Sequence, residues 1–232
     1  MRICGLQKLA MVDFPGKLAA TVFTGGCNLR CPFCHNALLV TKLAENPESH
    51  STEEIFSFLR SRKGLLDGVV LSGGEPLLQS DAADFLAEIK ALGYAVKLDT
   101  NGCFPEALAD ILERKLVDYV AMDIKNCRGK YAETVGIPGF DVSPVEKSLS
   151  LLQNSGIDFE LRTTVVKEFH TAADIRAIGE WCTGAPHYYL QNFVDSGNLV
   201  GSGCHSLEPL ELQAFADIAR PYFGDVQLRG ID

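Results

Sequence analysis

Short runs of β-branched and aromatic residues alternate along the chain with stretches whose apolar residues recur at helical spacing. This alternation predicts a repeated unit of one strand followed by one helix. Six such units in succession imply a parallel sheet with right-handed crossovers, and both an open doubly wound sheet and a partial barrel fit the pattern. The predicted strands are 19–23, 68–71, 95–99, 118–122, 158–165 and 187–191, and a last helix at 210–222 precedes a short strand at 226–228.

Residues that favour helix starts support the predicted helices. Ser51, followed by Glu54 three positions later, forms a candidate capping box. Ser80 and Thr171 are candidate N-caps, and Ser143 stands before a proline that would occupy the first helical position. These signals place helices between the strands, as the repeated unit requires.

No low-complexity tract or linker interrupts the pattern, so we expect one domain over residues 1–232. Its core would span about 19–192, with the last helix and strand in 206–232. Loops are expected at 43–50, 126–141 and 195–205.

The net charge and the hydropathy of the chain limit the kinds of molecule that it can be expected to bind. The 232 residues include 21 Lys and Arg against 30 Asp and Glu, which gives a net charge of −9. This acidic balance argues against nucleic acid as the main partner. No window reaches the roughly 18 apolar residues of a membrane helix, and the first thirty residues lack a secretory signal. We therefore expect a cytoplasmic protein without a membrane partner.

The eight cysteines are unevenly distributed. Disulfides seldom persist in a reducing compartment, so a disulfide framework is not expected. Three cysteines crowd into residues 27–34, which predicts one metal or cluster site. The scattered ones show no second site and are expected to be packing or incidental thiols: Cys4, Cys103, Cys127, Cys182 and Cys204.

The clustered thiols Cys27, Cys31 and Cys34 can converge on one centre from a single loop. Soft thiolates select iron–sulfur clusters, zinc or copper(I). A cubane cluster usually takes four cysteines, so three would leave one iron open to a ligand. The alternative is a zinc site with His35 as the fourth ligand, but the neighbouring side chains of Cys34 and His35 diverge. The spacing favours a cluster over zinc.

Polar and glycine-rich segments follow the predicted strands at the edge where parallel α/β folds bind ligands. After the second strand, Gly73 and Gly74 permit close approach of the backbone to a ligand, and Glu75 could accept a hydrogen bond from an ammonium group. The alternative interpretation is a tight turn with Pro76 at the start of a helix.

Segment 27–34 resembles the CxxxCxΦC signature of the radical S-adenosylmethionine (SAM) superfamily, with Phe33 as the aromatic residue, and segment 72–76 resembles its GGE motif. The resemblance implies an α/β fold with a partial (β/α)6 TIM-like barrel of parallel strands. It implies a [4Fe-4S] cluster on the three clustered cysteines, whose open iron binds the amine and carboxylate of SAM. Main-chain atoms around Cys34, His35 and Asn36 would meet the adenine.

Segments 99–102, 122–125 and 13–16 are similar to those of glycyl-radical-enzyme activases. This similarity implies that Lys125 contacts the SAM carboxylate and that Arg162 also contacts SAM. It further implies that Asp99 and Asn101 lie beside the cofactor. A monovalent cation would be held by Asp99, Thr100 and Asp123. The alternative is that aspartate forms an ion pair with lysine here and no cation binds.

The activase resemblance also implies a reaction. Reductive cleavage of SAM would generate a glycyl radical on a partner enzyme, with a flavodoxin- or ferredoxin-type protein as electron donor. Segment 190–193 carries no histidine where pyruvate formate-lyase activases have one, which favours an anaerobic ribonucleotide reductase as partner. Two alternatives remain open: a radical SAM enzyme acting on a small molecule or a modified nucleoside, and a non-catalytic metal-binding adaptor.

Overall fold

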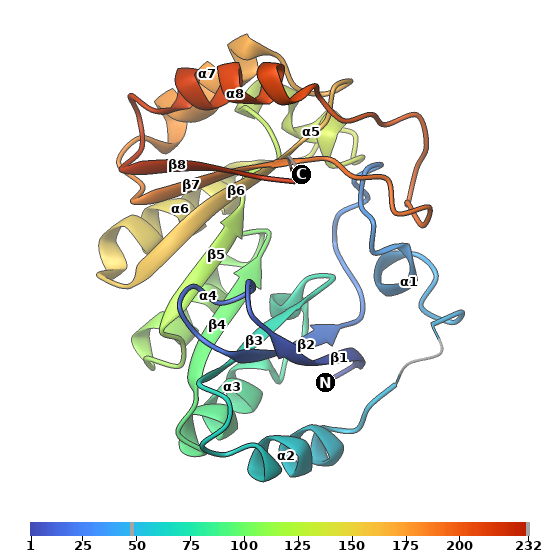
Figure 1. Cartoon of the computed structure of the whole chain (residues 1–232), viewed down its shortest axis with the longest axis vertical. Coiled ribbons are helices and arrows are strands. Elements are labelled where there is room, and N and C mark those ends of the chain that lie inside the picture. The colour runs from blue at the N-terminus through green and yellow to red at the C-terminus, as the bar shows by residue number, and fades with distance from the viewer. Residues whose placement is uncertain (47–48, 231–232) are drawn as a thin grey trace. The chain divides into compact units, whose positions relative to one another are not determined.

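The computed structural model describes residues 1–46 and 49–230 (Figure 1). The chain forms two compact units. The first comprises Met1–Asn28, Leu38–Thr100 and Phe104–Val120, and the second comprises Leu29–Ala37, Asn101–Cys103 and Ala121–Asp232. Parts of two predicted segments, residues 47–48 of the loop at 43–50 and residues 231–232 at the C-terminus, lie outside the described residues. The expectation of one domain stays a prediction.

The first unit contains β1 (Ile3–Ala10), β2 (Ala19–Thr24), β3 (Gly68–Gly73) and β4 (Ala95–Thr100), hydrogen-bonded in that order. Strands β2, β3 and β4 are parallel, whereas β1 runs antiparallel to β2. Strand β1 was not predicted from the sequence. Three consecutive residues in its second half are exposed, so it lacks the strict alternation by which a strand is recognised.

The helices of the first unit are α2 (Thr52–Ser61), the short η1 (Pro76–Leu78), α3 (Ala82–Ala91) and α4 (Pro105–Glu113). The predicted capping box of Ser51 and Glu54 is confirmed at α2. The N-cap predicted at Ser80 is wrong, because Asp81 occupies that position. The Asp81 carboxylate caps no helical amide and instead pairs with the N-terminal ammonium group of Met1. A further short helix, α1 (Ala37–Val40), follows the cysteine segment.

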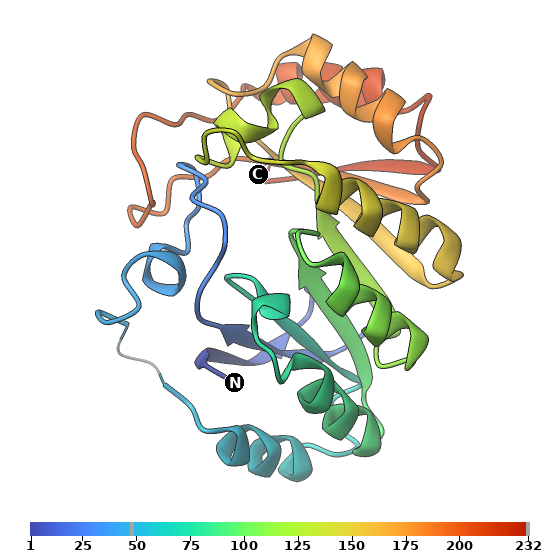
Figure 2. The ribbon, with the colours of Figure 1, turned by 180° about the vertical axis from the view of Figure 1, so that it is seen from behind.

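The second unit contains β6 (Asp158–Val165), β7 (His187–Asn192) and β8 (Asp225–Arg229), which are parallel and paired in that order. Strand β5 (Tyr119–Asp123) leads into this unit. Its helices are η2 (Arg128–Lys130), α5 (Tyr131–Thr134), α6 (Ser143–Ser155), α7 (Ala172–Cys182) and α8 (Pro209–Ala219). Helices α7 and α8 lie side by side over one face of these strands (Figures 1 and 2).

At the helix starts of the second unit, nearby side chains decide whether a predicted capping residue can bond to the helix. Thr171 and Asp174 form a capping box at α7, which confirms the predicted cap. The cap predicted at Ser143 is wrong, because Val142 is the N-cap of α6 and Ser143 lies inside the helix. Both the amide and the hydroxyl group of Ser143 donate to Asp141, at 3.0 and 2.8 Å. The upstream aspartate thus engages the hydroxyl group that would otherwise cap the helix.

Strand β4 has one apolar and one polar face, as residue alternation in a strand allows. In β4, Val96 and Leu98 are fully buried on one face, and Lys97 and Asp99 lie on the other. Alternating strands and helices with mainly parallel pairing confirm the predicted α/β class. Within residues 1–46 and 49–230, no helix has the length and apolar character needed to cross a membrane.

Candidate functional site

In the first unit, the loops that follow β2 and β3 are joined by backbone hydrogen bonds. The amide of Gly74 donates to the carbonyl oxygen of Thr24 at 2.9 Å, and the amide of Glu75 donates to that of Gly26 at 2.8 Å. A Cβ atom on Gly74 would lie 2.0 Å from the Gly26 oxygen, and Gly73 adopts a φ of +120°. The glycine pair therefore holds the start of the cysteine segment against β3.

Glu75 is fully buried between the ends of β3 and β4. Its carboxylate oxygen Oε1 accepts from the amide of Leu77 at 3.0 Å and from the hydroxyl group of Thr100 at 2.8 Å. The first contact caps η1, and the second ties the two strand ends together. Two of the predicted site residues, Glu75 and Thr100, are thus in direct contact.

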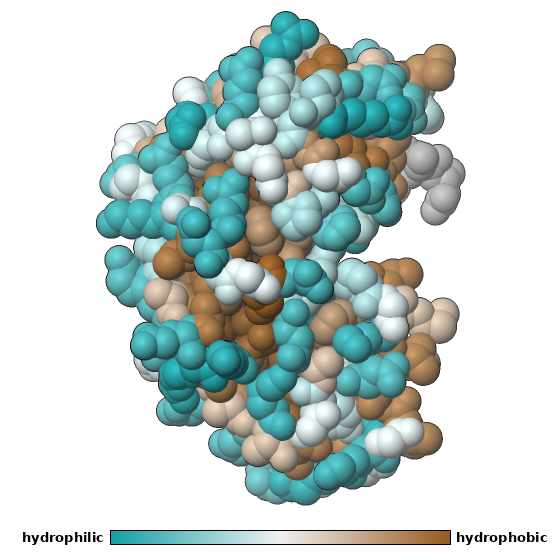
Figure 3. Space-filling view, turned by 90° about the vertical axis from the view of Figure 1, so that its left-hand side faces the viewer, coloured by the Kyte–Doolittle hydropathy of each residue, from teal (hydrophilic) through white to brown (hydrophobic). Residues whose placement is uncertain are grey.

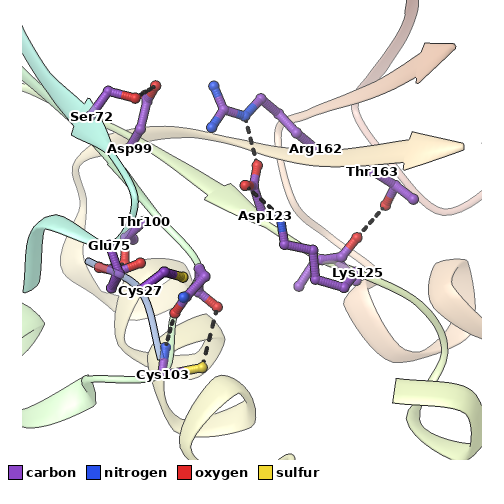
Figure 4. A network of polar contacts seen from close by, with 12 residues as sticks. Cys27, Ser72, Glu75, Asp99, Thr100, Cys103, Asp123, Lys125, Arg162 and Thr163 are labelled. Atoms are coloured by element: carbon purple, nitrogen blue, oxygen red, sulfur yellow. Dashed lines mark hydrogen bonds and ion pairs between the residues drawn. The ribbon is translucent and has the colours of Figure 1, made fainter. Parts of the chain in front are cut away.

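A partly buried ion pair lies on the polar face of β4. The Lys97 ammonium group is 2.5 Å from one carboxylate oxygen of Asp99, and Lys97 is only 2% exposed. The other carboxylate oxygen of Asp99 accepts from the Ser72 hydroxyl group at 3.0 Å (Figure 4). Lys97 was not among the predicted site residues. Its two-residue spacing from Asp99 on a strand was the signal available, since i and i+2 share a face.

In the second unit, the cysteine segment is braced along its length. The amide of Arg30 donates to the Val135 carbonyl oxygen at 2.9 Å. The amides of Val200 and Gly201 donate to the carbonyl oxygens of Cys34 and Pro32 at 3.0 and 2.8 Å. These backbone hydrogen bonds hold in place the loop that carries Cys31 and Cys34.

The aromatic residue of the signature, Phe33, is buried in the same unit. Its ring lies 5.9 Å from that of Phe169, centroid to centroid, in a tilted arrangement. The aromatic position of the motif therefore packs the cysteine loop onto the segment that follows β6.

All eight cysteines lie among the described residues, and none forms a disulfide. Cys31 is buried, while Cys27 and Cys34 are half-buried. No three His, Cys, Asp or Glu side chains of the described residues are grouped so as to hold a metal ion. Cys27 belongs to the first unit and the other two to the second. The donor set of three thiols on one loop suits a [4Fe-4S] cluster, and its assignment stays a prediction.

Two of the scattered cysteines, Cys182 and Cys204, have thiols with a raised pKa. Cys182 is fully buried in α7, and burial raises the pKa of its thiol well above the ordinary value. Burial also raises the pKa of Cys204, and the nearby carboxylates of Glu168 and Asp195 add to the effect. Thiols that resist deprotonation are poor metal ligands. This agrees with the packing role expected for both residues.

Asp123, at the end of β5, pairs with two cations of its own unit. One carboxylate oxygen is 2.9 Å from the ammonium group of Lys125, and the other is 2.9 Å from Nε of Arg162 (Figure 4). Burial by itself would raise the pKa of Asp123, but the two cations outweigh it and hold that pKa well below its usual range. Asp123 thus has cationic partners within its own unit, as the aspartate–lysine alternative requires.

The Lys125 ammonium group is also close to the cysteine segment. Burial alone would lower the pKa of Lys125, but the Asp123 carboxylate raises it above its ordinary value, and Cys31 adds to this rise. The second unit therefore brings together three predicted site residues, Lys125, Asp123 and Arg162, with Cys31 within electrostatic range.

A second buried acid, Glu160, lies on the polar face of β6 and was missed by the sequence analysis. Its carboxylate is 3.5 Å from Nη1 of Arg229 and 4.0 Å from Nη1 of Arg162. The Arg229 guanidinium group also stacks on the Tyr189 ring, 3.6 Å from its centroid. Glu160 and Arg162 are two residues apart on one strand, but the contribution of β8 depends on strand pairing that local sequence does not contain.

Replacing Glu160 with glutamine is expected to lower the free energy of unfolding by about 2 kcal/mol, because a buried carboxylate that pairs with two arginines loses its charge. The urea unfolding midpoint measures this effect. Glu180→Gln, at an exposed position of α7, is the matched control and should leave the midpoint unchanged. Equal midpoints for the two variants would contradict the stabilising role of Glu160.

The remaining predicted site residues are placed as follows. Asn101 is buried, and its side-chain oxygen accepts from the amide of Cys103 at 3.0 Å. His35 is exposed and Asn36 is half-buried. Asp99 and Asp123 belong to different units, so the predicted cation site stays a prediction.

Comparison with known proteins identifies the family. Residues 21–182 match the model of the radical SAM superfamily. A protein of Methanocaldococcus jannaschii, provisionally named glycyl-radical enzyme activating enzyme, is 33% identical over 99% of this chain and 96% of its own length. Pyruvate formate-lyase-activating enzyme of Listeria monocytogenes is 36% identical over 53% of each chain. This chain thus spans nearly the whole of the first relative and about half of the second.

Solved structures show the same fold. Streptococcus suis SuiB bound to its precursor peptide superposes with a TM-score of 0.72 at 16% identity, over 90% of this chain and 48% of SuiB. The enzyme anSMEcpe with bound AdoMet gives a TM-score of 0.65 at 20% identity, over 87% of this chain and 60% of the other. These likenesses agree with the fold implied by the resemblance. The superfamily implies a [4Fe-4S] cluster and SAM, and the extent of the family match shows that this chain is an enzyme of the radical SAM superfamily.

Proposed function

We propose that this protein is an activase that uses SAM to generate a glycyl radical on a partner enzyme. The observation that carries this proposal is the 33% identity, over nearly the full length of both chains, with the provisionally named activating enzyme of Methanocaldococcus jannaschii. The matches to pyruvate formate-lyase-activating enzymes of Listeria and Staphylococcus point to the same class.

Under this proposal, Cys27, Cys31 and Cys34 hold a [4Fe-4S] cluster. When bound and reduced, such a cluster would provide one electron to the SAM sulfonium, and cleavage of the bond between sulfur and C5′ would give methionine and a 5′-deoxyadenosyl radical. The protein binds and orients the substrate: the ammonium group of Lys125 and the guanidinium group of Arg162 attract the SAM carboxylate. Both cations are held by Asp123, which limits their freedom before SAM binds.

Glu75 would accept from the SAM ammonium group with the carboxylate that also accepts from Thr100. Gly73 and Gly74 would act indirectly, because they hold the start of the cysteine segment against β3. The predicted contacts of His35 and Asn36 with adenine, and of Asp99 and Asn101 with SAM, belong to the same proposal. A monovalent cation beside Asp99, Thr100 and Asp123 also belongs to it, although lysines already pair with both aspartates.

The partner is proposed to be an anaerobic ribonucleotide reductase, with electrons from a flavodoxin- or ferredoxin-type protein. In the turn between β1 and β2, Phe14 is buried against Ala19 and Val70, whereas Met11 and Val12 are 73% and 81% exposed. Apolar side chains are visible at the surface among polar ones in Figure 3. An exposed apolar pair beside the activase-like segment 13–16 would suit contact with a protein partner.

The test is anaerobic reconstitution with iron and sulfide, reduction, and measurement of 5′-deoxyadenosine and methionine. Purified anaerobic ribonucleotide reductase is added in one arm, pyruvate formate-lyase in a second, and no protein in a third. We expect a doublet electron paramagnetic resonance signal on the reductase, and loss of that signal when its radical-bearing glycine is replaced by alanine.

Each other outcome has a defined meaning. A doublet on pyruvate formate-lyase alone would support the activase function and would show that the partner is pyruvate formate-lyase instead of the reductase. Turnover with a small molecule or a modified nucleoside, without any radical on protein, would favour the alternative class of radical SAM enzyme. Failure to cleave SAM in every arm would favour the metal-binding adaptor and overturn the proposed function.

A further inference from the structure

The segment that follows β6 contains a buried histidine that no motif assigns. His170 is only 3% exposed and lies entirely within the second unit. Its Nε2 atom is 2.9 Å from the carbonyl oxygen of Lys125, and its Nδ1 atom is 3.1 Å from the amide nitrogen of Val166. The ring therefore links the turn after β6 to the backbone of a predicted site residue.

Three contacts bear on the protonation state of the ring. The Val166 amide can only donate and needs Nδ1 as its acceptor, whereas the Val166 carbonyl oxygen, 3.2 Å from Nδ1, already accepts from the His170 amide at 3.0 Å. The Lys125 carbonyl oxygen can only accept, so Nε2 must carry the proton. One neutral tautomer satisfies both partners, and burial lowers the pKa of His170, which favours the neutral form.

Neighbouring contacts hold the same stretch of backbone. The Thr163 hydroxyl group donates to the Ile124 carbonyl oxygen at 2.7 Å, and the Lys125 amide donates to the Tyr131 hydroxyl group at 3.3 Å (Figure 4 shows the Thr163 contact). The side chain of Asn126, which is fully buried, donates to the carbonyl oxygen of Phe169 at 2.9 Å. Buried side chains thus hold each residue from 124 to 126.

The turn that carries His170 also contacts the cysteine segment. Phe169 packs its ring against Phe33, and its neighbour His170 holds Lys125. Two adjacent residues therefore connect the loop that bears Cys31 and Cys34 to the segment that bears Lys125. Through them, the position of one segment restricts the position of the other.

We infer that His170 is a positioning residue, which holds the Lys125 backbone through its Nε2–H group so that the lysine ammonium group lies where the SAM carboxylate binds. This inference rests on the proposed function, because it assumes that Lys125 contacts SAM. The proposed role of His170 requires no contact with SAM or with the cluster. It acts through the main chain of Lys125.

The main test compares three variants of the full-length reconstituted protein. His170→Leu removes both ring contacts, His170→Gln retains an amide donor that can reach the Lys125 carbonyl oxygen, and Tyr94→Phe is the control. Tyr94 is also buried, and its hydroxyl group donates to the Leu59 carbonyl oxygen at 2.7 Å in the first unit. The control therefore loses one buried side-chain bond to a backbone carbonyl away from Lys125.

For His170→Leu we expect the KM for SAM to rise about tenfold with kcat nearly unchanged, since a contact made in both ground and transition states is weakened. The affinity for SAM, measured by equilibrium dialysis without reductant, should fall by the same factor. Faster hydrogen exchange at the amides of Lys125 and Asn126 should accompany the loss. His170→Gln should restore most of the affinity, and Tyr94→Phe should leave it unchanged.

An unchanged SAM affinity in folded His170→Leu, or an equal loss in Tyr94→Phe, would overturn the inference. If His170→Leu does not fold, nitrogen NMR of the wild-type ring decides: an Nε2-protonated tautomer supports the inference, and an Nδ1-protonated one refutes it. Failure of the wild-type protein to bind or cleave SAM would instead defeat the proposed function. The exchange and NMR measurements would still report on the His170 contact.

Discussion

Replacing Cys31 with alanine is expected to abolish the iron–sulfur cluster and, with it, all SAM cleavage. Cys31 is the buried member of the three clustered cysteines and lies within electrostatic range of Lys125. A cubane held by three thiolates loses a third of its protein ligands when one is removed. Iron and sulfide analysis after anaerobic reconstitution should fall from about four atoms of each per chain to background.

Cys182→Ala is the matched control for this experiment. Cys182 is fully buried in α7, and its thiol resists deprotonation. The control should retain the iron content and the visible absorption of the wild type, although its stability falls by the cost of a small cavity. Equal loss of iron in the two variants would contradict the assignment of Cys31. Retention of one zinc ion by the wild type in place of iron would contradict the cluster itself.

Replacing Gly74 with alanine is expected to destabilise the protein by about 3 kcal/mol or more and to reduce cluster assembly. The new Cβ atom would lie 2.0 Å from the carbonyl oxygen and 2.7 Å from the carbonyl carbon of Gly26. Both neighbours are backbone atoms, so the clash cannot be relieved by rotating a side chain. The loop that leads to Cys27 would have to move away from β3.

Thermal and urea unfolding measure the loss of stability, and iron content measures cluster assembly. Gly129→Ala is the control, because a Cβ atom on Gly129 meets nothing within 4 Å. It should change stability by no more than about 0.5 kcal/mol. Wild-type stability in Gly74→Ala would show that the two loops do not pack as closely as the structure has them.

The secondary structure was largely predictable because the parallel strands of an α/β fold are buried and carry strong local signals. All seven predicted strands are present, including the short last one, and the strand at Asp158–Val165 has the predicted bounds. The failures have local physical causes. Strand β1 (Ile3–Ala10) is half exposed, which weakens its alternation. The N-cap of α3 is Asp81 instead of Ser80, and the Ser143 hydroxyl group is bound by Asp141 instead of capping α6.

The candidate site likewise contains residues that the sequence identified and residues that it did not. The cysteines, the aromatic Phe33 and the glycine pair stand in contiguous motifs, so their chemistry is evident without a structure. The contact between Glu160 and Arg229 could not be assigned from the sequence, because the pairing of β6, β7 and β8 brings these residues together. Lys97 and Asp99 stand two residues apart on one strand, so the sequence contained a signal for this pair.

By itself, the sequence determined the α/β class, the three-thiol motif and the family that these features indicate. Only the tertiary structure decided that Arg229 pairs with Glu160 and that His170 holds the backbone of Lys125. The physical reason is the range of the interactions. Strand and helix preferences and the spacing of ligands on one loop are local properties of the chain. Hydrogen bonds and ion pairs between residues that are 40 to 70 positions apart depend on how the folded strands and loops are brought together.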